Sequence, residues 1–157
     1  MNYEKEIGKI LTSKNWKIST TESCTGGLLS SKLTDISGSS SYISLNLVTY
    51  ANEAKNKMLG VKENTLNSFG AVSEECAFEM AKGLYELTQS EICVSTTGIA
   101  GPTGGTKDKP VGLMYSTIYT SQKHQTYKIQ VDSSLPRIKI KEEFVKEVLK
   151  NIYEFLD

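Results

Sequence analysis

The sequence predicts an α/β protein: a single three-layer α/β/α domain built on a mixed, partly antiparallel sheet. Runs rich in β-branched and aromatic residues alternate along the chain with segments in which apolar residues recur at helical spacing. Two strand-like runs, 111–120 and 124–131, are joined by a short polar loop, so we expect that pair to be antiparallel. No repeat, low-complexity tract or linker divides the chain, and residues 1–157 are expected to form one domain.

The expected elements follow one another in a regular order. Helices are predicted where apolar residues recur with a period near 3.6, and strands where β-branched residues cluster or alternate with polar ones. In chain order we expect helix 2–13, strand 16–23, a helix from Leu28, strand 41–50, helices 52–58, 62–68 and 73–89, strands 91–98, 111–120 and 124–131, and a helix from about Arg137.

Particular residues indicate where several of these helices begin. Two glycines precede the helix from Leu28. Asn52 is expected to cap the short helix after the second strand, and Ser73 the long helix after it, because their side-chain oxygens can accept from free backbone N–H groups. The last helix has apolar residues four positions apart from Ile140 to Ile152, which predicts one buried face.

Composition excludes several classes of protein. Eighteen basic residues balance eighteen acidic ones, so no strong positive field indicates a nucleic-acid partner. No stretch approaches the roughly 20 apolar residues of a membrane span, and the charged N-terminus lacks an apolar signal region, so a cytoplasmic location is expected. The three cysteines form no CxxC pair and His124 is the sole histidine, so neither a metal nor another cofactor is expected.

The loop 98–110 stands out by its glycines and its two prolines between two predicted strands. Long ordered loops of this kind are often functional. The alternative is a wide connection that needs unusual backbone angles. No glycine directly precedes Lys107 as in a Walker loop, and G-x-G-x-x-G is absent, so neither common phosphate-binding motif is present.

The stretch TTESCTGG, residues 20–27, places three candidate nucleophiles in a row at a strand-to-helix turn, beginning with Ser23. One interpretation is a helix cap. The other is a reaction centre, in which Gly26 and Gly27 let a ligand approach the backbone while free N–H groups stabilise an oxyanion. Because neighbouring side chains at a turn point in different directions, the pattern leaves open whether Ser23 or Cys24 faces the site.

A hydroxyl nucleophile needs a base. His124 lies near a predicted hairpin loop among polar neighbours and is expected at the surface. Lys55 is the other choice, because it falls in the first turn of the helix after Asn52, where the helix dipole and burial would lower its pKa from about 10.4. The ordinary alternative is a solvated lysine, which is the expectation for Lys57 and Lys62.

Four stretches give the sequence a family resemblance: TTESCTGG, VTYANEAK, GAVSEE and TTGIAGPTGG…KPVG. They stand in the same order as in the C-terminal domain of the CinA (competence/damage-inducible) family, and the resemblance runs from about residue 5 to 155. The chain looks like the stand-alone form of that domain. Members of the family act as amidohydrolases, so the resemblance implies conversion of nicotinamide mononucleotide and water to nicotinate mononucleotide and ammonia, which recycles pyridine nucleotides.

The resemblance also implies roles for individual residues. Ser23 corresponds to the family's nucleophile, Lys55 to its base and Tyr50 to a further catalytic residue, so the choice of Ser23 over Cys24 rests on this resemblance. Leu135 and Pro136 replace the usual Gly-Asp before the family's arginine. The substrate-binding residues expected are Thr97, Gly26, Gly27, Gly98, Gly101 and Arg137, the last of which suits a 5′-phosphate.

The expected partner is a small-molecule mononucleotide, with no nucleic acid and no membrane. Similar proteins imply a homo-oligomer, a dimer or larger. Two alternatives stay open: a non-catalytic binding module associated with competence or DNA damage, and an amidohydrolase for another amide, such as free nicotinamide or glutamine.

Overall fold

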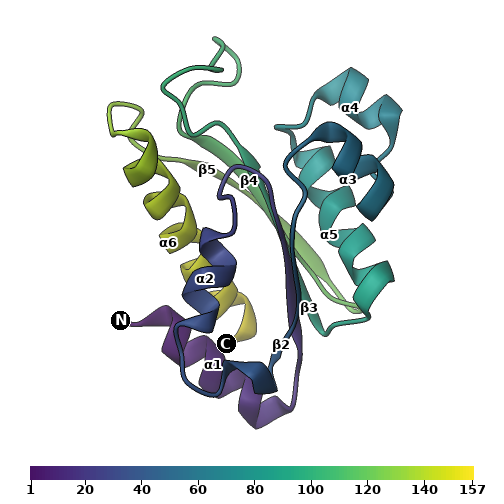
Figure 1. Ribbon diagram of the computed structural model, residues 1–157, viewed down its shortest axis with the longest axis vertical. Coiled ribbons are helices and arrows are strands. Elements are labelled where there is room, and N and C mark those ends of the chain that lie inside the picture. Colours follow the sequence, from purple (N-terminus) through teal and green to yellow (C-terminus); the bar gives the residue numbers. More distant parts are fainter.

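The computed structural model describes residues 1–157. In chain order its elements are α1 (Tyr3–Lys14), β1 (Ile18–Glu22), α2 (Leu28–Thr34), the 3₁₀ turn η1 (Ser39–Ser41), β2 (Ile43–Val48), α3 (Asn52–Leu59), α4 (Glu63–Phe69), α5 (Glu74–Thr88), β3 (Ile92–Gly98), β4 (Leu113–Tyr119), β5 (His124–Gln130) and α6 (Arg137–Leu156). These elements form three layers: α1, α2 and α6 cover one face of the sheet, and α3, α4 and α5 cover the other (Figure 1). The predicted α/β class is confirmed.

The five strands lie in the order β2-β1-β3-β4-β5. β1 is parallel to both β2 and β3, whereas β3, β4 and β5 pair in antiparallel fashion, as expected for the last two strands. The carboxyl ends of the three parallel strands therefore meet at one edge of the sheet. The chain leaves β1 toward β2 but leaves β3 toward β4, and such a divergence is where open α/β sheets bind ligands.

Both faces of β1 are covered, and its five residues are all buried. The larger core cluster, of 20 buried residues, lies on the side of α1, α2 and α6. The smaller one packs α3 and α5 against the sheet and consists of Leu59, Val61, Cys76, Met80, Leu84 and Cys93. Because burial of apolar area drives this packing, the smaller cluster is what holds α3 in place beside the sheet.

The two ends of the chain lie on the same helical layer, away from the edge where the parallel strands end (Figure 1). The ring of Tyr3 in α1 packs on that of Tyr153 in α6, with centroids 5.6 Å apart. None of the helices combines the length and the apolar character needed to cross a lipid bilayer.

The cap prediction was right for α5 and wrong for α3. Ser73 Oγ accepts from the backbone N–H of Cys76, 3.1 Å away. Asn52 does not cap α3, because Ala51 holds the N-cap position and Asn52 is the first helical residue. Lys55 in the first turn of α3 donates to the carbonyls of Thr49 and Tyr50, so the segment before Ala51 is held by this lysine rather than by a capping side chain.

α3 crosses α5 at Gly83, where the two backbones come into direct contact. A Cβ built on Gly83 would lie only 1.9 Å from the carbonyl oxygen of Leu59. Glycine is therefore required at this crossing for steric reasons, and the crossing sets how closely α3 approaches the rest of the domain.

Gly83→Ala is expected to lower the free energy of unfolding by about 1–3 kcal/mol, because the added methyl forces α3 and α5 apart. The loss should appear although alanine favours helix more than glycine does. Urea unfolding followed by circular dichroism measures it. The matched control is Lys82→Ala at the neighbouring exposed position, with a change within about 0.5 kcal/mol. An unchanged unfolding midpoint in Gly83→Ala would contradict the tight crossing.

Candidate active site

Ser23 and Lys55 meet at the carboxyl edge of the parallel strands. Lys55 Nζ lies 3.0 Å from Ser23 Oγ, although the residues are 32 positions apart in the chain. Ser23 directly follows β1. Because side chains of a helix tilt toward its N-terminus, Lys55 in α3 reaches back to the strand edge from which the helix starts.

Lys55 is a buried amine without a counterion. Its side chain is 1% exposed, and it takes part in none of the protein's ion pairs. Nζ donates to the backbone carbonyls of Thr49 at 2.9 Å and Tyr50 at 2.8 Å. Burial lowers the pKa of Lys55 below its usual value, and the nearby thiols oppose this only in part. By contrast, Lys57 pairs with Glu53 at the surface, as predicted.

Cys24 belongs to the core on the side of α1, α2 and α6, whereas Lys55 lies in α3 on the other side of the sheet. Cys24 is 5% exposed and packs within the larger core cluster beside residues such as Leu29. Burial, together with the nearby Glu22 carboxylate, raises the pKa of the Cys24 thiol to about 12, so its thiolate is scarce near neutral pH. Of the two candidate nucleophiles, only Ser23 contacts an amine that could accept its proton.

The start of α2 is occupied by a buried carboxylate rather than open to an anion. The N-cap residue, Gly27, has no capping side chain. Glu22 accepts instead from the backbone N–H groups of Leu29 at 2.9 Å and Ser30 at 3.0 Å, and from the hydroxyls of Thr25 and Ser30 at 2.6 Å each. Glu22 therefore braces the turn, and these two helical N–H groups cannot serve as the oxyanion site that the sequence suggested.

The turn after Glu22 is left open by two glycines. Gly26 and Gly27 both have positive φ, 59° and 101°, which a side chain would disfavour. Gly26 donates its N–H to the Ser23 carbonyl at 3.1 Å and so closes the turn. The backbone N–H groups of Thr25 and Gly27 donate to no acceptor in the protein.

Adjacent threonines at the end of β3 point to opposite sides. The Thr96 carbonyl accepts from the Ser23 N–H at 3.1 Å, and the hydroxyls of Thr96 and Thr25 lie 2.8 Å apart, so Thr96 fixes the turn from below. The Thr97 hydroxyl donates to the Ala71 carbonyl at 2.7 Å. The hydroxyl proton of Thr97, which was predicted to bind substrate, is thus engaged with the loop before α5. Its hydroxyl oxygen can still accept a hydrogen bond.

Arg137 joins three parts of this edge. Its guanidinium donates to the Gly101 carbonyl at 2.7 Å and to the Tyr50 hydroxyl at 3.2 Å. Pro136 occupies the N-cap position of α6, so the altered flank still delivers Arg137 to the predicted neighbourhood. The Tyr50 side chain is 58% exposed, and it is the Tyr50 carbonyl rather than its phenol that contacts the amine described above.

The remaining predicted glycines, Gly98 and Gly101, are needed for close packing of backbone segments. A Cβ on Gly98 would lie 2.6 Å from the Leu113 carbonyl oxygen in β4, and one on Gly101 would lie 2.4 Å from a methyl of Val111. Both glycines therefore allow the loop that follows β3 to pack closely on its return segment. The predicted catalytic residues and Arg137 are brought together. Gly98 instead allows close packing of β3 on β4.

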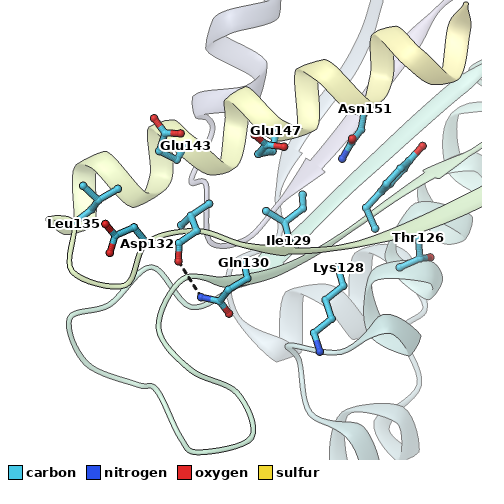
Figure 2. Close-up of a pocket in the computed structure, with 11 residues that line it drawn as sticks. Thr126, Lys128, Ile129, Gln130, Asp132, Leu135, Glu143, Glu147 and Asn151 are labelled. Atoms are coloured by element: carbon cyan, nitrogen blue, oxygen red, sulfur yellow. Dashed lines mark hydrogen bonds between the residues drawn. The ribbon is translucent and has the colours of Figure 1, made fainter.

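A groove between β5 and α6 is a separate feature (Figure 2). Glu143, Glu147 and Asn151 of α6 face Ile129 of β5 across it, whereas Thr126 and Lys128 lie on the other side of that strand. None of the predicted site residues lines this groove. His124, at the start of β5, is exposed as predicted and stacks on the ring of Tyr119. Neither place sets a nucleophile beside a base.

Two residues at this site, Thr49 and Lys141, were not predicted from the sequence. Thr49 acts through its backbone carbonyl, which any residue carries, and its place was visible only in three dimensions. Lys141, in the second turn of α6, lies close to the Ser23 turn: a Cβ on Gly26 would be 3.4 Å from its Nζ. Lys141 could not be singled out from the sequence, because α6 contains several lysines and spacing alone does not tell which of them faces another element.

Comparison with known proteins gives one consistent result. The profile of the CinA C-terminal domain matches residues 1–156. A CinA-like protein of Chloroherpeton thalassium is 56% identical over 123 residues, which cover 78% of this chain and 29% of that protein. A competence-damage inducible protein of Caldanaerobacter subterraneus subsp. tengcongensis is 47% identical over 136 residues, covering 87% of this chain and 33% of its own. The chain thus spans about a third of the length of these curated relatives.

Solved structures agree over the whole chain. The competence/damage inducible protein CihA from Agrobacterium tumefaciens is 35% identical, with a TM-score of 0.93 and coverage of 100% of this chain and 97% of that one. A competence or damage-inducible protein from Enterobacter asburiae is 30% identical, with a TM-score of 0.93 and coverage of 99% and 96%. The three-layer fold is therefore shared with these proteins.

Glu22→Gln is expected to lower the free energy of unfolding by about 1–3 kcal/mol, since it sets an amide NH₂ against one of the two helical N–H groups and leaves that donor unpaired. Thermal and urea unfolding measure the loss. Glu53→Gln, which removes an exposed carboxylate in a surface ion pair, is the matched control and should change stability by about 0.5 kcal/mol or less. Equal effects of both substitutions would argue against the bracing role of Glu22.

Proposed function

This chain belongs to the CinA C-terminal domain family, and from that premise we propose that it hydrolyses the carboxamide of nicotinamide mononucleotide to nicotinate mononucleotide and ammonia. The observation that carries the proposal is the contact of 3.0 Å between Ser23 Oγ and the buried amine of Lys55. The choice of substrate follows from the resemblance of the Ser23, Lys55, Tyr50 and Arg137 stretches to the family's motifs.

The three hydrogen-bond partners of Lys55 Nζ can also accommodate the neutral amine. A neutral amine has two N–H donors and one lone pair. In the structure Nζ donates to the carbonyls of Thr49 and Tyr50 and to Ser23 Oγ. When Lys55 loses a proton, its two remaining donors are enough for the two carbonyls, and its lone pair can accept the Ser23 proton. Since burial also lowers the pKa of Lys55, the neutral form is accessible closer to neutrality than for an ordinary lysine.

The reaction proceeds in two stages. Ser23 Oγ attacks the carboxamide carbon while its proton passes to Lys55 Nζ, which gives a tetrahedral intermediate. Lys55 then donates that proton to the leaving nitrogen, ammonia departs, and an acyl ester on Ser23 forms. Water attacks the ester, losing a proton to Lys55, and the Ser23 oxygen leaves with that proton, so the nicotinate product is released and the enzyme is restored.

An oxyanion site is needed because a carboxamide is a weak electrophile. The N–H groups of Thr25 and Gly27 are free donors in the same turn as Ser23. With Glu22 holding the start of α2, these two groups are the proposed partners of the developing negative charge. Tyr50, Gly101 and Arg137 form the adjoining wall, and the Thr97 hydroxyl oxygen can still accept a hydrogen bond from the substrate.

A non-catalytic binding role is the second candidate, favoured by the names of the relatives, which refer to competence and damage. Such a role gives no reason to bury a lysine beside a serine hydroxyl. Ammonia release from purified protein supplied with nicotinamide mononucleotide separates the two, because the binding role predicts none above background. Free nicotinamide and glutamine in parallel test the substrate class.

Ser23→Ala is expected to reduce ammonia release by more than about 10³-fold, since the attacking oxygen is removed. Circular dichroism and thermal unfolding should show an unchanged fold. The matched control is Ser31→Ala, which removes a hydroxyl from α2 outside the site. Near-normal turnover by Ser23→Ala would show that another group attacks, with water first in line because Cys24 is turned into the core.

The pH dependence of kcat/KM should report the protonation of Lys55. The base must be neutral, so activity rises with pH, is half-maximal at the pKa of Lys55 and levels off above it, and burial places this pKa below the usual lysine value of about 10.4. Lys55→Arg, which stays protonated, should be inactive at every pH, whereas Lys57→Arg at the surface should match the wild type. A rise that begins only above the ordinary lysine pKa would exclude Lys55 as the base.

A further inference from the structure

Lys141 is a cation at the site edge that has no partner in the protein. It forms none of the protein's ion pairs and none of its side-chain hydrogen bonds, and it is half-buried. Its Nζ lies over the Ser23 turn, 3.4 Å from where a Cβ of Gly26 would be. Holding an ammonium there without a carboxylate leaves its charge available to a ligand.

Arg137, one helical turn earlier, lies on the same side of α6 but is already engaged. Its two terminal nitrogens donate to the Gly101 carbonyl and the Tyr50 hydroxyl, which ties the loop after β3 to the segment after β2. Two of its five N–H donors are therefore committed to these two wall segments, whereas none of the Lys141 donors is committed. The contacts thus separate two tasks: Arg137 holds the walls together, and Lys141 keeps its donors free.

Ser23 and Lys141 are close enough to contact opposite ends of one small substrate. Gly26 and Ser23 close a single turn, whose end Cα atoms lie within about 7 Å of each other. The ammonium of Lys141 stands over the far end of this turn, at Gly26. The one acidic side chain of the turn, Glu22, is fully buried and satisfied by four donors, so no nearby carboxylate competes for Lys141.

We propose that Lys141 binds the 5′-phosphate of the substrate, while Arg137 is a positioning residue that joins Tyr50 to the loop after β3. This inference rests on the proposed function and assigns the anionic end of the mononucleotide. A lysine ammonium acts on phosphate as a compact point charge with three donors, which suits a dianion at the rim of a turn.

The test compares Lys141→Gln with Lys150→Gln, a matched change at an exposed, unpaired lysine later in α6. For nicotinamide mononucleotide, kcat/KM should fall about 10- to 100-fold in Lys141→Gln and stay unchanged in Lys150→Gln, since a charge-assisted contact to phosphate is lost. For nicotinamide riboside, which lacks the phosphate, wild type and Lys141→Gln should be equal. Lys141→Arg should restore most of the activity. An equal loss on both substrates, or none on either, would overturn the assignment.

Binding of ribose 5-phosphate, measured by calorimetry, separates this inference from the proposed reaction. Wild type should bind it, and Lys141→Gln should bind it about 10- to 100-fold more weakly. Binding that depends on Lys141 in a protein without amidohydrolase activity would support the phosphate site and reject the reaction. Turnover of the mononucleotide together with equal binding by both proteins would do the reverse.

Discussion

The enclosure of one uncompensated amine is the constraint on which the rest of this structure depends. Lys55 is buried where only two backbone carbonyls and one hydroxyl surround its nitrogen. A protonated amine loses most from such enclosure, so the fold itself favours the reactive form. Keeping water out requires α3 to lie close against α5, and the glycine at their crossing permits that approach. A contact far from the chemistry thus maintains the environment of the nitrogen.

The buried carboxylate of Glu22 complements that amine from the opposite side of the sheet. The alternation of an extended chain sends Glu22 toward α2 and Ser23 toward α3. The Glu22 carboxylate is a rigid anchor because both of its oxygens accept hydrogen bonds. The Ser23 hydroxyl has one basic neighbour, Lys55. The turn is consequently held rigid through Glu22, while the Ser23 hydroxyl stays free to react. A rigid support for a reactive group is what a preorganised site requires.

Local pattern predicted the order of helices and strands, because period and composition are set by which face each segment buries. It failed at Asn52, where bonds from the Lys55 side chain to the carbonyls of Thr49 and Tyr50 hold the segment before the helix. Lys55 was predicted as a base from its place in the first turn of a helix, whereas the choice of Ser23 over Cys24 came from the family resemblance, and spacing could not show their contact because 32 residues separate them. The carbonyl of Thr49 and the placement of Lys141 depend on tertiary contact alone, so no local rule could have identified them.

The packing of Tyr3 on Tyr153 brings both chain ends to the helical layer of α1, α2 and α6, away from the edge where the parallel strands end (Figure 1). A polypeptide attached at either terminus therefore leaves the domain from this helical layer. A larger polypeptide can carry this unit as a module without obstructing the mouth of the site. For the same reason, joining the two ends by a short peptide and reopening the chain in the hairpin between β4 and β5 would yield a permuted molecule with its reactive edge intact.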